Sequence, residues 1–131
     1  MRHRSRWRIL LAGIALIGAI SFAPDAGAGE ISSREALGLQ EAGDSPLFVD
    51  VRTPEEYQSG HVPGAINIPR NQLTSRLAEL EHARDRLVVY CERGPRAAAA
   101  IATLLSSGFT GVRHLSGDMA GWRAAGLPIE K

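Results

Sequence analysis

The chain has 131 residues, of which 44% are hydrophobic and 22% charged, and its formal net charge is +1. This length suits one ordinary domain, and the composition is that of a globular protein. A net charge near zero gives no support to nucleic-acid binding, which favours a basic patch or stripe. The single cysteine excludes an internal disulfide framework and a thiolate-rich zinc site.

The first 28 residues have the order of a secretory signal. Four arginines alternate from Arg2 to Arg8, residues 9–23 are apolar except for Ser21, and Ala26-Gly27-Ala28 supplies small residues for cleavage. We expect 1–28 to be a signal peptide cleaved after Ala28, which would place the protein in the periplasm or cell envelope. One alternative is an uncleaved anchor, but the apolar run is shorter than the about 20 residues that span a bilayer. The other is a buried core helix, which the arginines directly before the run disfavour.

Without residues 1–28 the chain loses four arginines and one aspartate, which leaves 103 residues with 11 basic and 13 acidic side chains. We expect this segment, 29–131, to be one mildly acidic domain with a small core.

Short apolar runs alternate with helical patterns along this segment. Residues 47–51 and 87–90 are continuous apolar runs typical of central parallel strands buried on both faces. Residues 65–68 and 112–115 are shorter and more mixed, which predicts strands nearer an edge of the sheet.

Helix signals fall between the strands. Ser32 and Glu35 predict a capping box for a helix that ends near Gly43, and Thr53-Pro54-Glu55-Glu56 is a stronger helix start that Gly60 ends. Three further helices are expected: one carrying Leu73, Leu77 and Leu80, one from Ala97 to Leu105 that we expect to be covered on most sides, and one from Asp118 to Ala125. Strands that alternate with helices predict a single α/β domain with a mostly parallel sheet.

The residues that carry chemistry are concentrated at 91–96. Cys91 directly follows the apolar run 87–90, and ligands of open α/β sheets bind outside the carboxyl ends of strands. Backbone N–H groups at the start of the next helix, together with Arg93 and Arg96, favour a thiolate and a bound anion. Gly94 lets the loop bend, and Pro95 suits the first turn of the helix.

A cysteine at a strand end is most often a small buried hydrophobe. The two arginines, the glycine and the following helix favour a reactive thiol instead. An unpaired cysteine in an exported chain also calls for a reactive or intermolecular role.

The segment Cys91-Glu92-Arg93-Gly94-Pro95-Arg96 resembles the C-x-x-G-x-R active-site loop of the rhodaneses, the single-domain sulfurtransferases. Residues 50–57 with 60–69 are similar to the amino-terminal signature of that family, and 115–122 to its carboxy-terminal signature, so the resemblance covers about 30–129. Two positions depart from the pattern. Asp118 stands where the family usually has a second Gly, and Ala97 where Ser is common, which bears on loop geometry and helix entry.

The resemblance implies a rhodanese-like domain, with about five mostly parallel strands flanked by helices on both faces. It also implies a catalytic Cys91 whose thiolate takes the outer sulfur of thiosulfate, or of another persulfide donor, and passes it to cyanide, a small thiol or an exported protein cysteine. Backbone amides of 92–96 would cradle the persulfide, and Arg93 and Arg96 would attract the dianionic donor. No metal and no cofactor beyond the persulfide are implied. Contact with a membrane is expected only through 1–28 if that segment is uncleaved.

Several neighbours of Cys91 have more than one interpretation. Arg96 either attracts the donor or ties the loop to a carboxylate such as Asp50. Asp50 and Arg52 follow a strand and either shape the pocket rim or form a supporting network. Glu92 opposes anion binding at the nucleophile, so we expect it to point to solvent or to favour a thiol or protein persulfide over thiosulfate.

The remaining candidates have simpler interpretations. His61 is expected to be a structural loop residue, and Tyr57 and Trp122 core aromatics. His82 and His114 have no acidic or histidine companion at ligand spacing in the sequence, so we expect no metal site.

Two other functions compete with sulfur transfer. Dual-specificity phosphatases and certain arsenate reductases use a similar domain with a longer C-x5-R loop, whereas four residues separate Cys91 from Arg96 here. A binding module that only docks a partner is the third hypothesis, and the presence of Cys91 argues against it.

Overall fold

The computed structural model describes residues 29–131, so the predicted signal peptide lies outside the described residues. Five parallel strands form one sheet in the order β1-β5-β4-β2-β3. Their bounds are Gly29–Ile31 for β1, Leu47–Asp50 for β2, Ile66–Asn67 for β3, Leu87–Tyr90 for β4 and Arg113–Leu115 for β5. The predicted α/β class with a five-stranded parallel sheet is confirmed.

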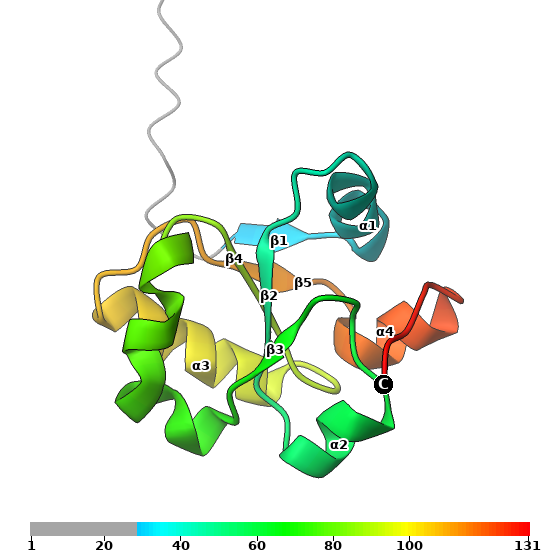
Figure 1. Ribbon diagram of the computed structural model, residues 1–131. Coiled ribbons are helices and arrows are strands. Elements are labelled where there is room, and N and C mark those ends of the chain that lie inside the picture. The colour runs from blue at the N-terminus through cyan, green and yellow to red at the C-terminus, as the bar shows by residue number, and fades with distance from the viewer. Residues whose placement is uncertain (1–28) are drawn as a thin grey trace, which may run out of the picture.

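Helices connect the strands and cover both faces of the sheet (Figure 1). They are α1 (Ser33–Glu41), α2 (Pro54–Ser59), the 3₁₀ helix η1 (Arg70–Ala83), α3 (Pro95–Ser106) and α4 (Asp118–Ala124). Because all strands are parallel, the turns after β2, β3, β4 and β5 lie at one edge of the sheet, the edge where ligands of such sheets bind.

Two apolar cores lie on opposite faces of the sheet. One joins β2 and β4 residues such as Val49 and Val89 to α3 and η1. The other joins their sequence neighbours Phe48 and Val88 to α1 and α4, where Trp122 is fully buried. Successive strand residues point to opposite faces, so the continuous apolar runs of the central strands supply both cores.

The start of α2 shows how local sequence sets the edge of the site. Thr53 Oγ1 accepts the backbone N–H of Glu56 at 3.2 Å, and the Glu56 carboxylate accepts the backbone N–H of Thr53 at 3.3 Å. With Pro54 in the first turn, this capping box begins the helix directly after the turn that follows β2.

Three details differ from the sequence predictions. Helix α3 is exposed along one side at Ala98 and Ala102, because alanine favours helix formation whether or not it is buried. The segment with the leucine repeat is a 3₁₀ helix with a kink at Arg76. Strand β1 forms one edge of the sheet and has no clear sequence signal, while β5 lies beside it, near an edge as expected for 112–115.

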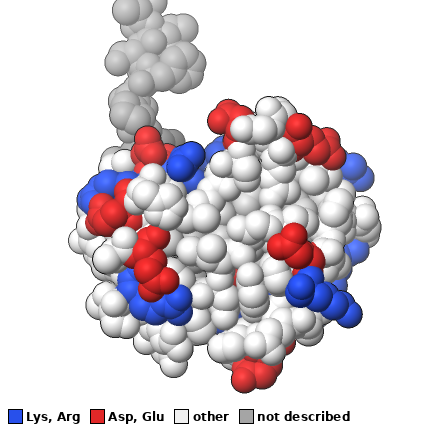
Figure 2. Space-filling model, in the orientation of Figure 1, with Lys and Arg blue, Asp and Glu red and all other residues white. Residues whose placement is uncertain are grey.

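Charges of both signs are interspersed on the face shown in Figure 2. Arg76 pairs with Glu79 of the same helix η1 at 2.6 Å, and Arg84, directly after η1, pairs with Glu81 at 2.7 Å. Within 29–131, no helix is long and apolar enough to cross a membrane.

Candidate active site

Cys91 lies at the centre of the site, between the end of β4 and the start of α3. Its side chain is almost fully buried at 1% exposure, and its sulfur accepts the backbone N–H of Gly94 at 3.0 Å. Gly94 has φ 121°, a conformation that L side chains rarely adopt and that glycine adopts without steric cost. The loop therefore directs a backbone dipole at Sγ at the N-terminal end of a helix, where negative charge is favoured.

The first turn of α4 holds the other side of this loop. The backbone N–H of Met119 donates to the carbonyl oxygen of Cys91 at 3.0 Å, and that of Ala120 donates to the carbonyl of Glu92 at 3.1 Å. The loop is thus fixed by the first turn of α4, whose bonding residues lie 28 positions further along the chain.

The carboxylate of Asp118, the first residue of α4, lies against the sulfur of Cys91. Its Oδ1 accepts the backbone N–H of Cys91 at 3.0 Å and lies 3.7 Å from Cys91 Sγ. His114 Nε2 lies 2.8 Å from the same oxygen, to which it donates a hydrogen bond. Asp118 is 3% exposed and has φ 54°, a left-handed conformation in which aspartate is better tolerated than most residues.

The expectation that His114 has no acidic companion was wrong. The two residues are four apart in sequence, and the turn from β5 into α4 brings their side chains together. The family pattern marked Asp118 as a departure, but it did not indicate contact with Cys91. Between residues 29 and 131 there is no group of three His, Cys, Asp or Glu side chains that could hold a metal ion.

Asp50 and Arg52 form a buried network below the loop. Both side chains are 0% exposed, and the Arg52 guanidinium donates to Asp50 through Nη2 at 2.7 Å and through Nε at 3.0 and 3.1 Å. Arg52 Nη2 also donates to the carbonyl of Gly60 at 2.8 Å. These bonds tie the turn after β2 to the end of α2, which is a supporting network, and Arg52 also lines the pocket described below.

The side chain of Glu92 is partly exposed, at 25%, but its carboxylate is held by arginines rather than free in solvent. It accepts two hydrogen bonds from Arg123 of α4, at 2.7 and 2.8 Å, and one from Arg52 at 3.2 Å. The Arg123 guanidinium is the main reason that the pKa of Glu92 lies below its ordinary value. Arg123 was missed from the sequence because nothing local connects it to the loop.

Arg96 ties the loop to a carboxylate, as one interpretation of the sequence proposed, but its partner is Glu56 rather than Asp50. The pair is bidentate, with Nη1–Oε1 and Nη2–Oε2 distances of 2.6 and 3.0 Å. This hydrogen bonding is the largest cause that lowers the pKa of Glu56 to about 2. The capping-box glutamate of α2 therefore also anchors the first turn of α3.

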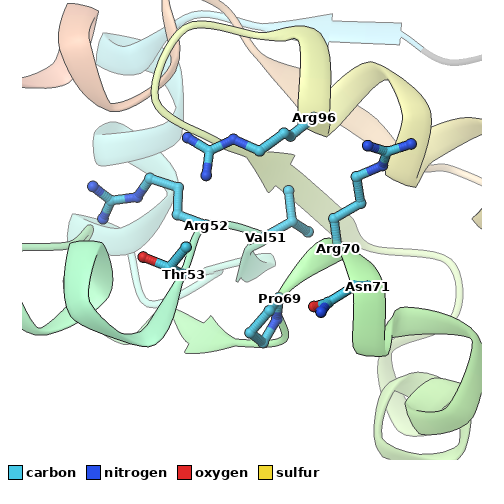
Figure 3. A pocket seen from close by; sticks show the side chains of 7 residues that line it. All are labelled: Val51, Arg52, Thr53, Pro69, Arg70, Asn71 and Arg96. Carbon is cyan, nitrogen blue, oxygen red and sulfur yellow. The ribbon is translucent and has the colours of Figure 1, made fainter.

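A pocket of about 240 Å³ opens beside the loop (Figure 3). Arg70, at the start of η1, and Arg96 line it from different elements. Arg70 was also missed from the sequence. Arg93 is exposed, and within the described chain it forms no ion pair. The other lining residues are Val51, Arg52, Thr53, Pro69 and Asn71.

His61 is a buried loop residue, as expected. Its ring stacks on Tyr57 with 3.7 Å between centroids, and its Nδ1 lies 2.8 Å from the Tyr57 carbonyl oxygen. Trp122 is a core residue, and Tyr57 is partly buried against the same core.

Residues 32–125 match the model of the rhodanese-like domain. The chain belongs to the rhodanese-like domain family. Among curated proteins it is 47% identical over 103 residues to an HTH-type transcriptional regulator of Mycobacterium tuberculosis, covering 77% of this chain and 44% of the regulator. It is 39% identical over 83 residues to a sulfurtransferase of Allochromatium vinosum, covering 63% of this chain and 77% of that protein.

The same rhodanese-like fold occurs in solved structures. A thiosulfate sulfurtransferase from Pseudomonas aeruginosa superposes with a TM-score of 0.71 and 30% identity, covering 79% of this chain and 20% of that one. The chain thus spans most of one sulfurtransferase, but less than half of the regulator and a fifth of the solved structure.

Proposed function

We propose that this rhodanese-like domain is a sulfurtransferase that carries sulfane sulfur as a persulfide on Cys91. Sulfurtransferase relatives support sulfur transfer as the general chemistry. The observation that carries the proposal is the sulfur of Cys91, which accepts the Gly94 amide at 3.0 Å where α3 begins. An amide aimed at sulfur stabilises a thiolate, the nucleophilic form of cysteine.

The transfer proceeds by two displacements through a covalent intermediate. The Cys91 thiolate attacks the outer sulfur of the donor, such as thiosulfate, and the donor's S–S bond breaks as sulfite leaves with the bonding electron pair. A cyanide ion or an acceptor thiolate then attacks the outer sulfur of the persulfide, and the Cys91 thiolate leaves. No oxidant or reductant is required.

The surroundings of Cys91 restrict what can react. Because the side chain is 1% exposed, a donor must present a terminal sulfur atom rather than a bulky group. Arg70 supplies positive charge in the pocket beside the loop, while Arg96, which also lines that pocket, is held by Glu56. Arg93, two residues after Cys91 in the sequence, adds a further positive charge. The loop has four residues between Cys91 and Arg96, one fewer than phosphatase loops, and Pro95 offers no N–H, so the loop has fewer amides for a phosphate and favours sulfur.

We also propose that the protein acts outside the cytoplasm, with residues 1–28 as its export signal. The support is the sequence pattern alone, since this segment lies outside the described residues.

Intact-mass measurement tests the sulfurtransferase proposal. The protein is treated with thiosulfate and with glutathione persulfide, and its mass is compared with that of Cys91→Ala. We expect one added sulfur on the wild type that cyanide removes as thiocyanate, and none on the variant. An equal adduct on both proteins, or phosphate release from an aryl phosphate without any sulfur adduct, would overturn the proposal.

A further inference from the structure

Several of the charged groups around Cys91 are paired with one another, whereas the exposed Arg93 forms no ion pair within the described residues. Arg96 pairs with Glu56, and Arg123 pairs with Glu92 of the loop. Arg52 pairs with Asp50, at the end of β2, and also with Glu92. Asp118 is the carboxylate that directly approaches Sγ, and its own partner is the imidazole of His114.

Both oxygens of Asp118 face the cysteine loop. Oδ1 lies 3.7 Å from Sγ, and Oδ2 lies 3.3 Å from the position that a Cβ at Gly94 would occupy. Asp118 is 3% exposed, so its charge is screened less than that of a surface carboxylate. The hydrogen bond from His114 and that from the Cys91 amide hold it in this position.

A buried negative charge at this point acts differently on different sulfur donors. Thiosulfate is a dianion whose negative charge is shared between its sulfonate oxygens and its outer sulfur, and this charge must come near Asp118 when the outer sulfur reaches Sγ. A persulfide in its R–S–SH form brings no charge, and its S–H proton finds an acceptor in the carboxylate.

We propose that Asp118, positioned by His114, determines donor specificity by disfavouring dianionic donors relative to sulfane sulfur carried on a thiol. This inference rests on the proposed sulfur transfer and names the substrate class of the same site. In the favoured step the Cys91 thiolate attacks the outer sulfur of R–S–SH, and the S–S bond breaks. R–S⁻ leaves with the bonding pair, and the outer sulfur with its proton becomes the Cys91 persulfide.

Two substitutions separate the charge of Asp118 from its shape. Asp118→Asn removes the charge but keeps an oxygen that accepts the Cys91 amide, and asparagine tolerates the left-handed backbone. Asp118→Gly removes the whole side chain, suits φ 54° and restores the residue usual in the family. The matched control for a change in net charge is Asp44→Asn. Asp44 is an exposed carboxylate that precedes β2, at the opposite edge of the sheet from the site.

The measurement is the second-order rate constant of Cys91 persulfide formation, followed by intact mass at one pH, with thiosulfate and with glutathione persulfide. We expect Asp118→Asn and Asp118→Gly each to raise the ratio of the thiosulfate constant to the glutathione persulfide constant by about tenfold, the scale of one partly screened charge a few ångströms away. We expect the ratio of Asp44→Asn to stay within about twofold of the wild type.

The outcomes separate this inference from the proposed function. If the wild type takes sulfur from neither donor, sulfur transfer fails and the specificity inference fails with it. If the wild type takes sulfur but Asp118→Asn changes both constants by the same factor, only the specificity inference is overturned. A ratio that rises in Asp118→Gly but not in Asp118→Asn also overturns it, because loop shape would then be the cause.

Discussion

The buried pair of Asp50 and Arg52 offers a stringent test of how the loop is supported. Arg52→Met keeps an apolar stem of similar length but removes the guanidinium. The change deletes the hydrogen bonds to Asp50, to the Gly60 carbonyl and to Glu92. It leaves the carboxylate of Asp50 buried at 0% exposure without its counter-charge.

Removing one partner of a buried ion pair costs about 3–5 kcal/mol, because the remaining charge has lost its compensation. This is a large share of the about 5–15 kcal/mol that stabilises a typical domain. We therefore expect Arg52→Met to lower the Tm by at least about 12 °C, from the usual 4–8 °C per kcal/mol for a domain of about 100 residues. Persulfide formation on Cys91 should also slow, since Arg52 supports the loop through Glu92.

Urea unfolding of wild type and variants measures the free energy of unfolding. Arg123→Met is the matched control, because it removes an arginine that also binds Glu92 but is 41% exposed, and such surface pairs contribute about 0–1 kcal/mol. The double variant Asp50→Leu, Arg52→Met removes both charges and should be more stable than Arg52→Met alone. The reasoning is refuted if Arg52→Met costs no more than Arg123→Met, or if the double variant is less stable than the single one.

Two further predictions concern positions at the edge of the site and far from it. The pKa of Glu56 is lowered from 4.5 to about 2, mainly by Arg96, so the pair stabilises the fold above about pH 4.5 and loses this effect as pH falls toward 2. Glu56→Gln should lower the free energy of unfolding by about 1 kcal/mol at pH 7, a value reduced by partial exposure, and by almost nothing at pH 2, as urea unfolding at both pH values would show. Gly111 has φ 66°, and an added Cβ would lie 2.4 Å from the Asp85 carbonyl oxygen. Thermal unfolding should show Gly111→Ala to be less stable than Gly126→Ala, which has a similar φ of 68° but open space around it; equal losses would contradict the steric argument.

Much of the fold could be predicted because its signals are local. The apolar runs of β2 and β4 stand out since both faces of these strands are buried. The capping box at Thr53 predicted the start of α2, and Gly94 with Pro95 predicted the turn from Cys91 into α3. Strand β1 was missed because three residues, of which one is fully buried, carry too little pattern.

The partners of the site residues could not be predicted in the same way. Arg96 pairs with a glutamate 40 residues away, and Glu92 pairs with Arg123, 31 residues away. In the sequence, Glu92 has several basic residues and Arg96 several acidic residues as potential partners. Only the register of the parallel strands, which brings their following turns to one edge, selects among them.

The sequence alone determined the α/β class, the position of the cysteine at a strand end and the helix behind it, because these depend on periodicity and on residues adjacent in the chain. The tertiary structure decided the electrostatics of the thiol. It neutralised Glu92 and Arg96 through distant partners and placed Asp118, with His114, against the sulfur of the one cysteine. The interaction between charges depends on distance and burial, and both are set by how β4, β5 and their following helices pack together.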